Sequence, residues 1–112
     1  MNVLRTANEV VQSVLSRLPP EIRSAAEECQ ILFEEESEDS ELLGLFEGLD
    51  RGSPPSPDPE DWPRITLFLQ TIWEESDENS ANFREEVKIT FLHELGHYLG
   101  MSEEAVESLG LR

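Results

Sequence analysis

The feature that most constrains this chain is the segment 91–104, which reads FLHELGHYLGMSEE. It contains the pattern H-E-x-x-H, and His93 and His97 in this pattern are the two histidines of the chain. On a helix, residues four positions apart share one face, with Cβ atoms roughly 5–6 Å apart. Two imidazoles placed in this way can bind one metal ion, with the carboxylate of Glu94 beside the open coordination position.

The pattern continues as H-E-x-x-H-x-x-G-x-x-E. Gly100 can take the positive φ angle that ends a helix, so the chain can turn and bring Glu103 back as a third ligand. Together with His93 and His97, this ligand would complete a catalytic type of zinc site with one position left for water. The neighbouring Glu104 is the alternative third ligand, and on a following helix it would point about 100° away from Glu103. The spacing favours Glu103.

An H-E-x-x-H string also occurs by chance on amphipathic helices, so its surroundings decide how it is interpreted. Here the helix is strongly apolar, a glycine follows at the offset of a helix end, and an acid stands at the third-ligand position. These three features favour a metal site over a coincidence.

Length and charge limit the classes of protein to which the chain can belong. Its 112 residues predict a single domain, 1–112, with a modest core. The 25 acidic and 8 basic residues give a net charge of -17. This balance provides no basic patch for nucleic acid and disfavours anionic membranes. It favours peptide or protein partners that are basic or neutral, although an acidic surface also serves solubility.

The cysteine and hydropathy patterns predict a cytoplasmic protein. Cys29 is the single cysteine, so no internal disulfide can form, and we expect it to be a small buried apolar residue. The sequence shows neither an apolar N-terminal leader region nor a membrane-spanning run.

Hydrophobic periodicity predicts an α+β order of elements. A scaffold helix over 2–18 is stopped by Pro19-Pro20, and one or two helical turns follow over 21–28. We expect strands over 29–35, 42–48 and 64–70 and a short helix over 71–75. The third strand is the most apolar of the three and is therefore placed centrally. The glycines of the second strand suggest a bulge or a close approach of another backbone.

The helix that carries the motif is expected to have Asn82 as its N-cap, with Glu85 as the capping partner, and to end near Leu99. Ser102 can cap a last short helix over 103–109. In that helix we expect Val106 and Leu109 to pack inward and Gly110 to end it.

Two connecting segments have an unusual composition. The acidic run 34–41 is most simply a solvated connection, because it lacks the spacing and the glycine of an EF-hand calcium loop. The segment 49–61 contains four prolines and is expected to be either a functional loop or a plain surface loop. We expect Trp62 and Trp73 to pack in the core or at its rim.

The chain resembles the minimal zincin-like metallopeptidases of bacteria. The resemblance rests on LLGLFEG (42–48), PRITLF (63–68) and HELGHYLG (93–100) with the acids that follow. It implies a minimal zincin-like α+β fold, in which a sheet of about three strands packs on a scaffold helix and on the metal-binding helix. The family usually has an aspartate followed by an acid where this chain has Glu103-Glu104. A metzincin would have histidine at position 103, and a thermolysin-like enzyme takes its third ligand from a more distant helix.

The residues of this motif predict that the protein is a zinc metallopeptidase. Zinc bound by His93, His97 and Glu103 would lower the pKa of its water towards ~7, and Glu94 would act as the general base in the hydrolysis of a peptide bond. An extended substrate would lie along a strand edge, for which 43–47 is the candidate. The alternative is a non-catalytic metal-binding module that binds a protein partner through its acidic surface. A closed fourth coordination position or a buried cleft would favour the module.

Overall fold

A mixed three-stranded sheet forms one layer of the molecule. The computed structural model describes residues 1–38 and 41–108. Its strands are β1 (Gln30–Glu34), β2 (Gly44–Glu47) and β3 (Arg64–Phe68), in the order β1-β3-β2. β1 runs parallel to β3, while β2 runs antiparallel to it. The apolar third strand is therefore central, as its sequence predicts. Strand β2 lies at one edge of the sheet and contacts α4.

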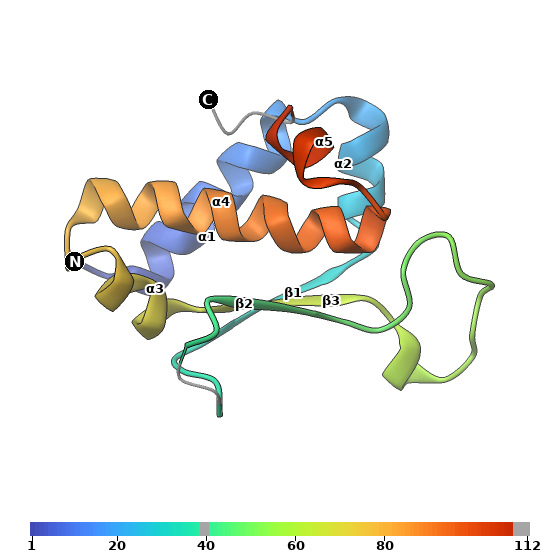
Figure 1. The fold of residues 1–112 in the computed structure, drawn as a ribbon, viewed down its shortest axis with the longest axis horizontal. Coiled ribbons are helices and arrows are strands. Elements are labelled where there is room, and N and C mark those ends of the chain that lie inside the picture. The colour runs from blue at the N-terminus through green and yellow to red at the C-terminus, as the bar shows by residue number, and fades with distance from the viewer. Residues whose placement is uncertain (39–40, 109–112) are drawn as a thin grey trace.

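The helices form the second layer, on one face of the sheet (Figure 1). They are α1 (Val3–Arg17), α2 (Pro20–Ala26), α3 (Leu69–Glu75), α4 (Ser80–Leu99) and α5 (Glu103–Glu107), with a 3-10 turn at Pro59–Asp61. The long helices α1 and α4 cross each other over the sheet, and α5 lies against α4. This is the α+β arrangement of a zincin-like fold that the sequence predicts.

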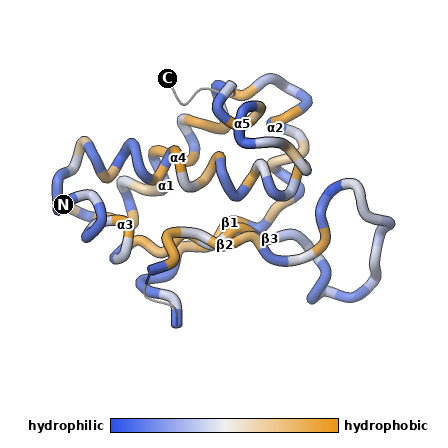
Figure 2. Tube along the Cα trace, in the orientation of Figure 1, coloured by the Kyte–Doolittle hydropathy of each residue, from blue (hydrophilic) through white to orange (hydrophobic). Residues whose placement is uncertain are grey.

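The core lies between these two layers, where apolar segments of the sheet and helices face one another (Figure 2). Ile65 and Leu67 of β3 are fully buried and point toward the helices. Phe91 and Leu95 of α4 are fully buried as well, and Val11 of α1 belongs to the same cluster. The helix that carries the motif is thus held by the core along its length.

Short-range hydrogen bonds define the ends of the helices that flank the motif. Gly100 has φ 66°, and the backbone N–H of Met101 donates to the carbonyl of Gly96, so the left-handed ending of α4 is confirmed. Ser102 caps α5 by accepting a hydrogen bond from the N–H of Ala105, also as predicted. Val106 is buried; the predicted roles of Leu109 and Gly110 lie outside the described residues.

The predicted N-cap of α4 at Asn82 is wrong. The helix begins at Ser80, and Asn79 is the N-cap, whose side chain accepts a hydrogen bond from the N–H of Asn82. Asp77 and Glu78 take positive φ angles in the turn that precedes the cap. This tight turn from α3 into α4 places the N-cap at Asn79, three residues before the predicted Asn82.

The boundaries of the other elements are close to the predicted ones. α3 begins at Leu69, so β3 ends two residues earlier than expected. Cys29 is buried, and burial raises the pKa of its thiol to about 12, as befits a small apolar residue. Trp73 packs edge-to-face on Phe83, but Trp62 is 57% exposed, contrary to its expected place in the packing. Within the described ranges, no helix is both long enough and apolar enough to cross a membrane.

At Gly44, strand β2 lies close to α4. A Cβ atom added there would lie 2.6 Å from Cγ2 of Thr90 and 3.2 Å from Cγ of Glu94. Both distances are shorter than ordinary contacts between carbon atoms. The glycine predicted to mark a close approach therefore lets the strand lie directly against the helix that carries the motif.

We predict that Gly44→Ala destabilises the protein by about 1–3 kcal/mol, because the new methyl group overpacks the contact between β2 and α4. Urea denaturation measures the loss. Gly52→Ala is the matched control, since the nearest heavy atom to its added Cβ is Oδ1 of Asp50 at 3.6 Å. In a Gly44→Ala/Thr90→Ser protein the methyl of Thr90 is gone, so the combined loss should be smaller than the sum of the single losses. Equal losses for Gly44→Ala and Gly52→Ala would contradict the contact.

Candidate metal centre and active site

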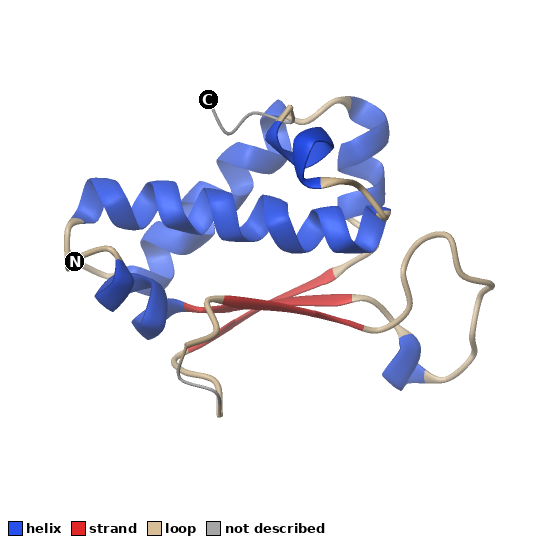
Figure 3. Ribbon diagram, viewed as in Figure 1, coloured by secondary structure: helices blue, strands red, loops and turns tan. Residues whose placement is uncertain are grey.

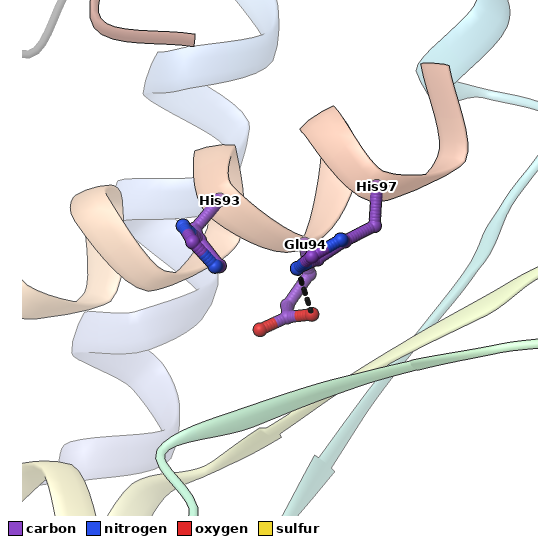
Figure 4. Close-up of side chains that lie close together, drawn as sticks. All are labelled: His93, Glu94 and His97. Carbon is purple, nitrogen blue, oxygen red and sulfur yellow. Dashed lines mark ion pairs between the residues drawn. The ribbon is translucent and has the colours of Figure 1, made fainter. Parts of the chain in front are cut away.

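The side chains of His93, Glu94 and His97 project from the same side of α4 toward the sheet (Figure 4). The two imidazole rings have centroids 4.8 Å apart and stand nearly perpendicular to each other. One ligand atom from each of the three residues can be chosen so that all lie within 4.8 Å of one another. The helical spacing of the motif therefore brings together two nitrogen donors and one carboxylate, a group that can hold a metal ion.

Glu94 is the buried member of this cluster. Its carboxylate accepts a hydrogen bond from the backbone N–H of Phe46 in β2, and one of its oxygens lies 3.9 Å from Nε2 of His97. Burial raises the pKa of Glu94, while His97, His93 and the Phe46 N–H act in the opposite direction. A carboxylate in such surroundings is a better proton acceptor than one in water, which suits it to act as a base.

An open cavity lies beside this carboxylate. It has a volume of about 370 Å³ and is lined by Leu45, Phe46, Gly48, Asp50, Glu94 and His97. Strand β2 supplies its apolar wall and α4 supplies two motif residues. The cluster is therefore accessible from solvent through a space that combines apolar and acidic surfaces.

Glu103, in the first turn of α5, lies next to His93. One of its carboxylate oxygens is 3.4 Å from Nδ1 of His93, and its side chain is 74% exposed. The glycine turn thus brings α5 back to the motif, as the spacing predicts, and places Glu103 against a histidine. Glu103 is outside the group of three residues whose ligand atoms are mutually close. Glu104 is exposed in the first turn of α5.

A family model for zincin-like metallopeptidases matches residues 21–111, which is most of the chain. The chain belongs to this family. The resemblance carried by the motif and by the two strand segments is thus confirmed. A search of curated proteins found no match.

A hydrogen-bonded network beside the metal-ligand cluster was not predicted from the sequence. In this zincin-like chain, the hydroxyl of Tyr98 donates to Oε1 of Glu28, and Nε of Arg51 donates to the same oxygen. The backbone N–H of Arg51 also donates to the carbonyl of Tyr98. The network ties the proline-rich loop and the end of α2 to the last turn of α4, immediately after His97.

The network also changes the acidity of its members. The hydrogen bond from Tyr98, and then that from Arg51, lower the pKa of Glu28. Burial, followed by the bond to Glu28, raises the pKa of Tyr98 to about 12. A buried tyrosine generally needs a partner for its hydroxyl, and this was the available signal in the sequence. Nothing in the sequence identified Glu28, which precedes Tyr98 by 70 positions.

We predict that Tyr98→Phe lowers the free energy of unfolding at pH 7 by about 0.5–1.5 kcal/mol, because Glu28 loses its main hydrogen-bond donor. Since the folded-state pKa of Glu28 lies below its ordinary value of 4.5, the network stabilises the fold above that pH. This contribution is lost as the pH falls through the lowered pKa. Denaturation at several pH values should therefore show the difference between the two proteins shrinking in acid. A difference that stayed constant from neutral pH to pH values well below 4.5 would contradict the assignment.

Proposed function

We propose that this protein is a zinc-dependent peptidase that hydrolyses peptide bonds at the cluster on α4. The observation that carries the proposal is a cluster of two imidazoles and a buried carboxylate, of which Glu94 and His97 line an open cavity beside a strand edge. Membership of the zincin-like metallopeptidase family supports it. An open cavity also favours the peptidase over the non-catalytic module, for which a buried cleft is expected.

The donor set fits zinc. Imidazole nitrogens and carboxylate oxygens are ordinary zinc ligands, and the three close residues offer both kinds. We propose His93, His97 and Glu103 as the ligands, because Glu103 is the acid that α5 brings against His93. Bound zinc would lower the pKa of its water and polarise the peptide carbonyl.

Glu94 is proposed as the general base. Its carboxylate takes a proton from the attacking water and later delivers it to the nitrogen of the departing amine. Burial favours the protonated form of Glu94 that this transfer creates, while the N–H of Phe46 holds the carboxylate in place. These two features suit a group that must accept and release one proton in each cycle.

The edge of β2 is the proposed binding strand for the substrate. The N–H of Phe68 donates to the carbonyl of Leu43, so Leu43 and alternate residues after it direct their backbone groups toward β3. The backbone groups of Gly44 and Phe46 point to the opposite edge, where the N–H of Phe46 meets Glu94. An extended peptide added at this edge would pair with the backbone of Gly44 and with the carbonyl of Phe46, since the Phe46 N–H is bonded to Glu94, and would pass directly beside the cluster.

We predict that the purified protein binds about one zinc ion per chain and that His97→Ala abolishes this binding. Glu94→Gln should retain zinc and the fold but lose hydrolysis, because an amide cannot accept the water proton. Metal analysis and a peptide-library cleavage assay measure the two properties separately. Full zinc retention by His97→Ala would refute the site. Equal cleavage by the wild type and Glu94→Gln would refute the mechanism, and a zinc-loaded protein that cleaves nothing would favour the binding module.

A second prediction separates the two adjacent acids of α5. Glu103→Gln should weaken zinc binding by roughly 10-fold or more. A loss of about this size is typical even for residues that only hydrogen-bond to a metal ligand, so removal of a ligand should cost at least as much. Glu104→Gln is the matched control at the next position and should bind zinc like the wild type. Competition with a chromophoric chelator gives both affinities. A large loss in Glu104→Gln with little in Glu103→Gln would show that the other acid is the ligand.

A further inference from the structure

The cavity beside the cluster contains an acid for which the proposed reaction has no use. Asp50 lines this cavity together with Leu45 and Phe46, yet it comes from the loop that follows β2 and lies outside the motif. Glu94, the other acid in the cavity, is already bonded to the N–H of Phe46. Asp50, an exposed residue, therefore adds a second acidic group to the lining of the cavity beside Glu94.

The backbone around Asp50 is fixed by a turn. The hydroxyl of Ser53 donates to Oδ1 of Asp50 at 2.9 Å, and the N–H of Ser53 donates to the Asp50 carbonyl at 3.1 Å. A carboxylate can accept about four hydrogen bonds in all, so this one leaves most of its acceptor capacity free. The turn thus positions an anionic side chain that can still bind a cation.

Arg51 and Arg64 are paired with acids other than Asp50. In the described part of the chain, Arg51 pairs with Glu28 at 3.0 Å and Arg64 pairs with Glu47 at 3.5 Å. The hydroxyl of Tyr98 also binds the oxygen of Glu28 that Arg51 contacts. The charge of Arg51 is therefore engaged by Glu28 rather than by its neighbour Asp50. The carboxylate of Asp50 is left to bind a cation that comes from outside the chain.

Asp50 also lines a second cavity, which has a volume of about 460 Å³. Asp50 lines both cavities, and the second is also lined by Leu49, Pro54 and the exposed ring of Trp62. Two cavities that meet at one residue offer more binding surface than a single amino acid needs, which favours a peptide. Arg51 lines the second cavity as well, with its charge paired to Glu28, whereas the first cavity has Asp50 and Glu94 beside apolar residues. The lining of the first cavity therefore suits a side chain with an apolar stem and a positive end.

We infer that the protein selects peptides that carry lysine or arginine next to the bond to be cleaved, and that Asp50 binds the charged end of this side chain. This inference rests on the proposed peptidase function and specifies its substrate class. The stem of the basic side chain would lie against Leu45 and Phe46. The net charge of -17 adds a general attraction for basic peptides, which any test must separate from the local effect of Asp50.

Binding of two matched peptides tests the inference without relying on catalysis. The probes are acetyl-Ala-Ala-Lys-Ala-Ala-Leu-amide and the same peptide with norleucine in place of lysine, which removes the charge and keeps the stem. Calorimetry with chelator-treated protein gives both dissociation constants. The wild type should bind the lysine peptide about two- to fivefold more tightly, which is the range of a solvent-accessible ion pair. Asp50→Asn should lose this preference, since the amide still accepts from Ser53 but carries no charge.

Asp58→Asn is the matched control, because Asp58 lies in the same loop and outside the residues that line the two cavities. It removes the same charge and should keep the preference for lysine. Equal affinity of the wild type for the two peptides, failure to bind either peptide, or equal effects of the two variants would overturn the inference. Cleavage of the same peptides by the zinc-loaded wild type is a separate test of the peptidase. A lysine preference without cleavage would retain the role of Asp50 and reject the peptidase.

Discussion

The close packing of β2 on α4 is the interaction on which the site depends. Because Gly44 has no side chain, the strand lies directly against Thr90 and Glu94 of the helix. At that separation the N–H of Phe46 reaches the carboxylate of Glu94. One contact between layers therefore stabilises the fold, holds the buried acid and places a strand edge beside the histidines. A bulkier residue at position 44 would disturb all three together.

The helix α4 has two roles that conflict in physical terms. It supplies fully buried residues such as Phe91 and Leu95 to the core, and it also carries a buried carboxylate one residue before Leu95. Burying an anionic group is unfavourable unless hydrogen bonds or opposite charges compensate for it. The raised pKa of Glu94 reflects this cost, and the N–H of Phe46 together with the two histidines offsets part of it. The conflict is tolerated at a position where a proton acceptor is useful.

The sequence predicted the features that depend on residues close together in the chain. The cluster on α4 follows from the period of a helix, the helix ending follows from Gly100, and the central place of β3 follows from its apolar composition. The N-cap was misplaced by three residues because two asparagines with similar capping ability stand close together and a turn between helices selects Asn79. The exposure of Trp62 was missed because composition does not reveal which side of a loop faces solvent.

Residues that meet only in the folded chain could not be predicted. Glu28 and Tyr98 are 70 positions apart, and no local pattern joins them. Asp50 follows a short strand, like many loop acids, and its place in the cavity depends on how the loop is tied back to α4. The sequence thus contains the cluster of His93, Glu94 and His97 in one segment, whereas the residues that line the neighbouring cavities are spread over several.

Gly96, which lies inside the motif, also helps to place α5 and the carboxylate of Glu103. This glycine lies between Glu94 and His97, and a Cβ added there would come within 2.3 Å of Cγ2 of Val106. Its lack of a side chain therefore lets α5 pack against the middle of the motif, with Val106 buried in the contact. Glu103 lies one turn before Val106 on α5, so the same packing sets the distance of its carboxylate from His93. Two glycines thus act together: Gly100 turns the chain, and Gly96 provides the surface on which the returning helix rests.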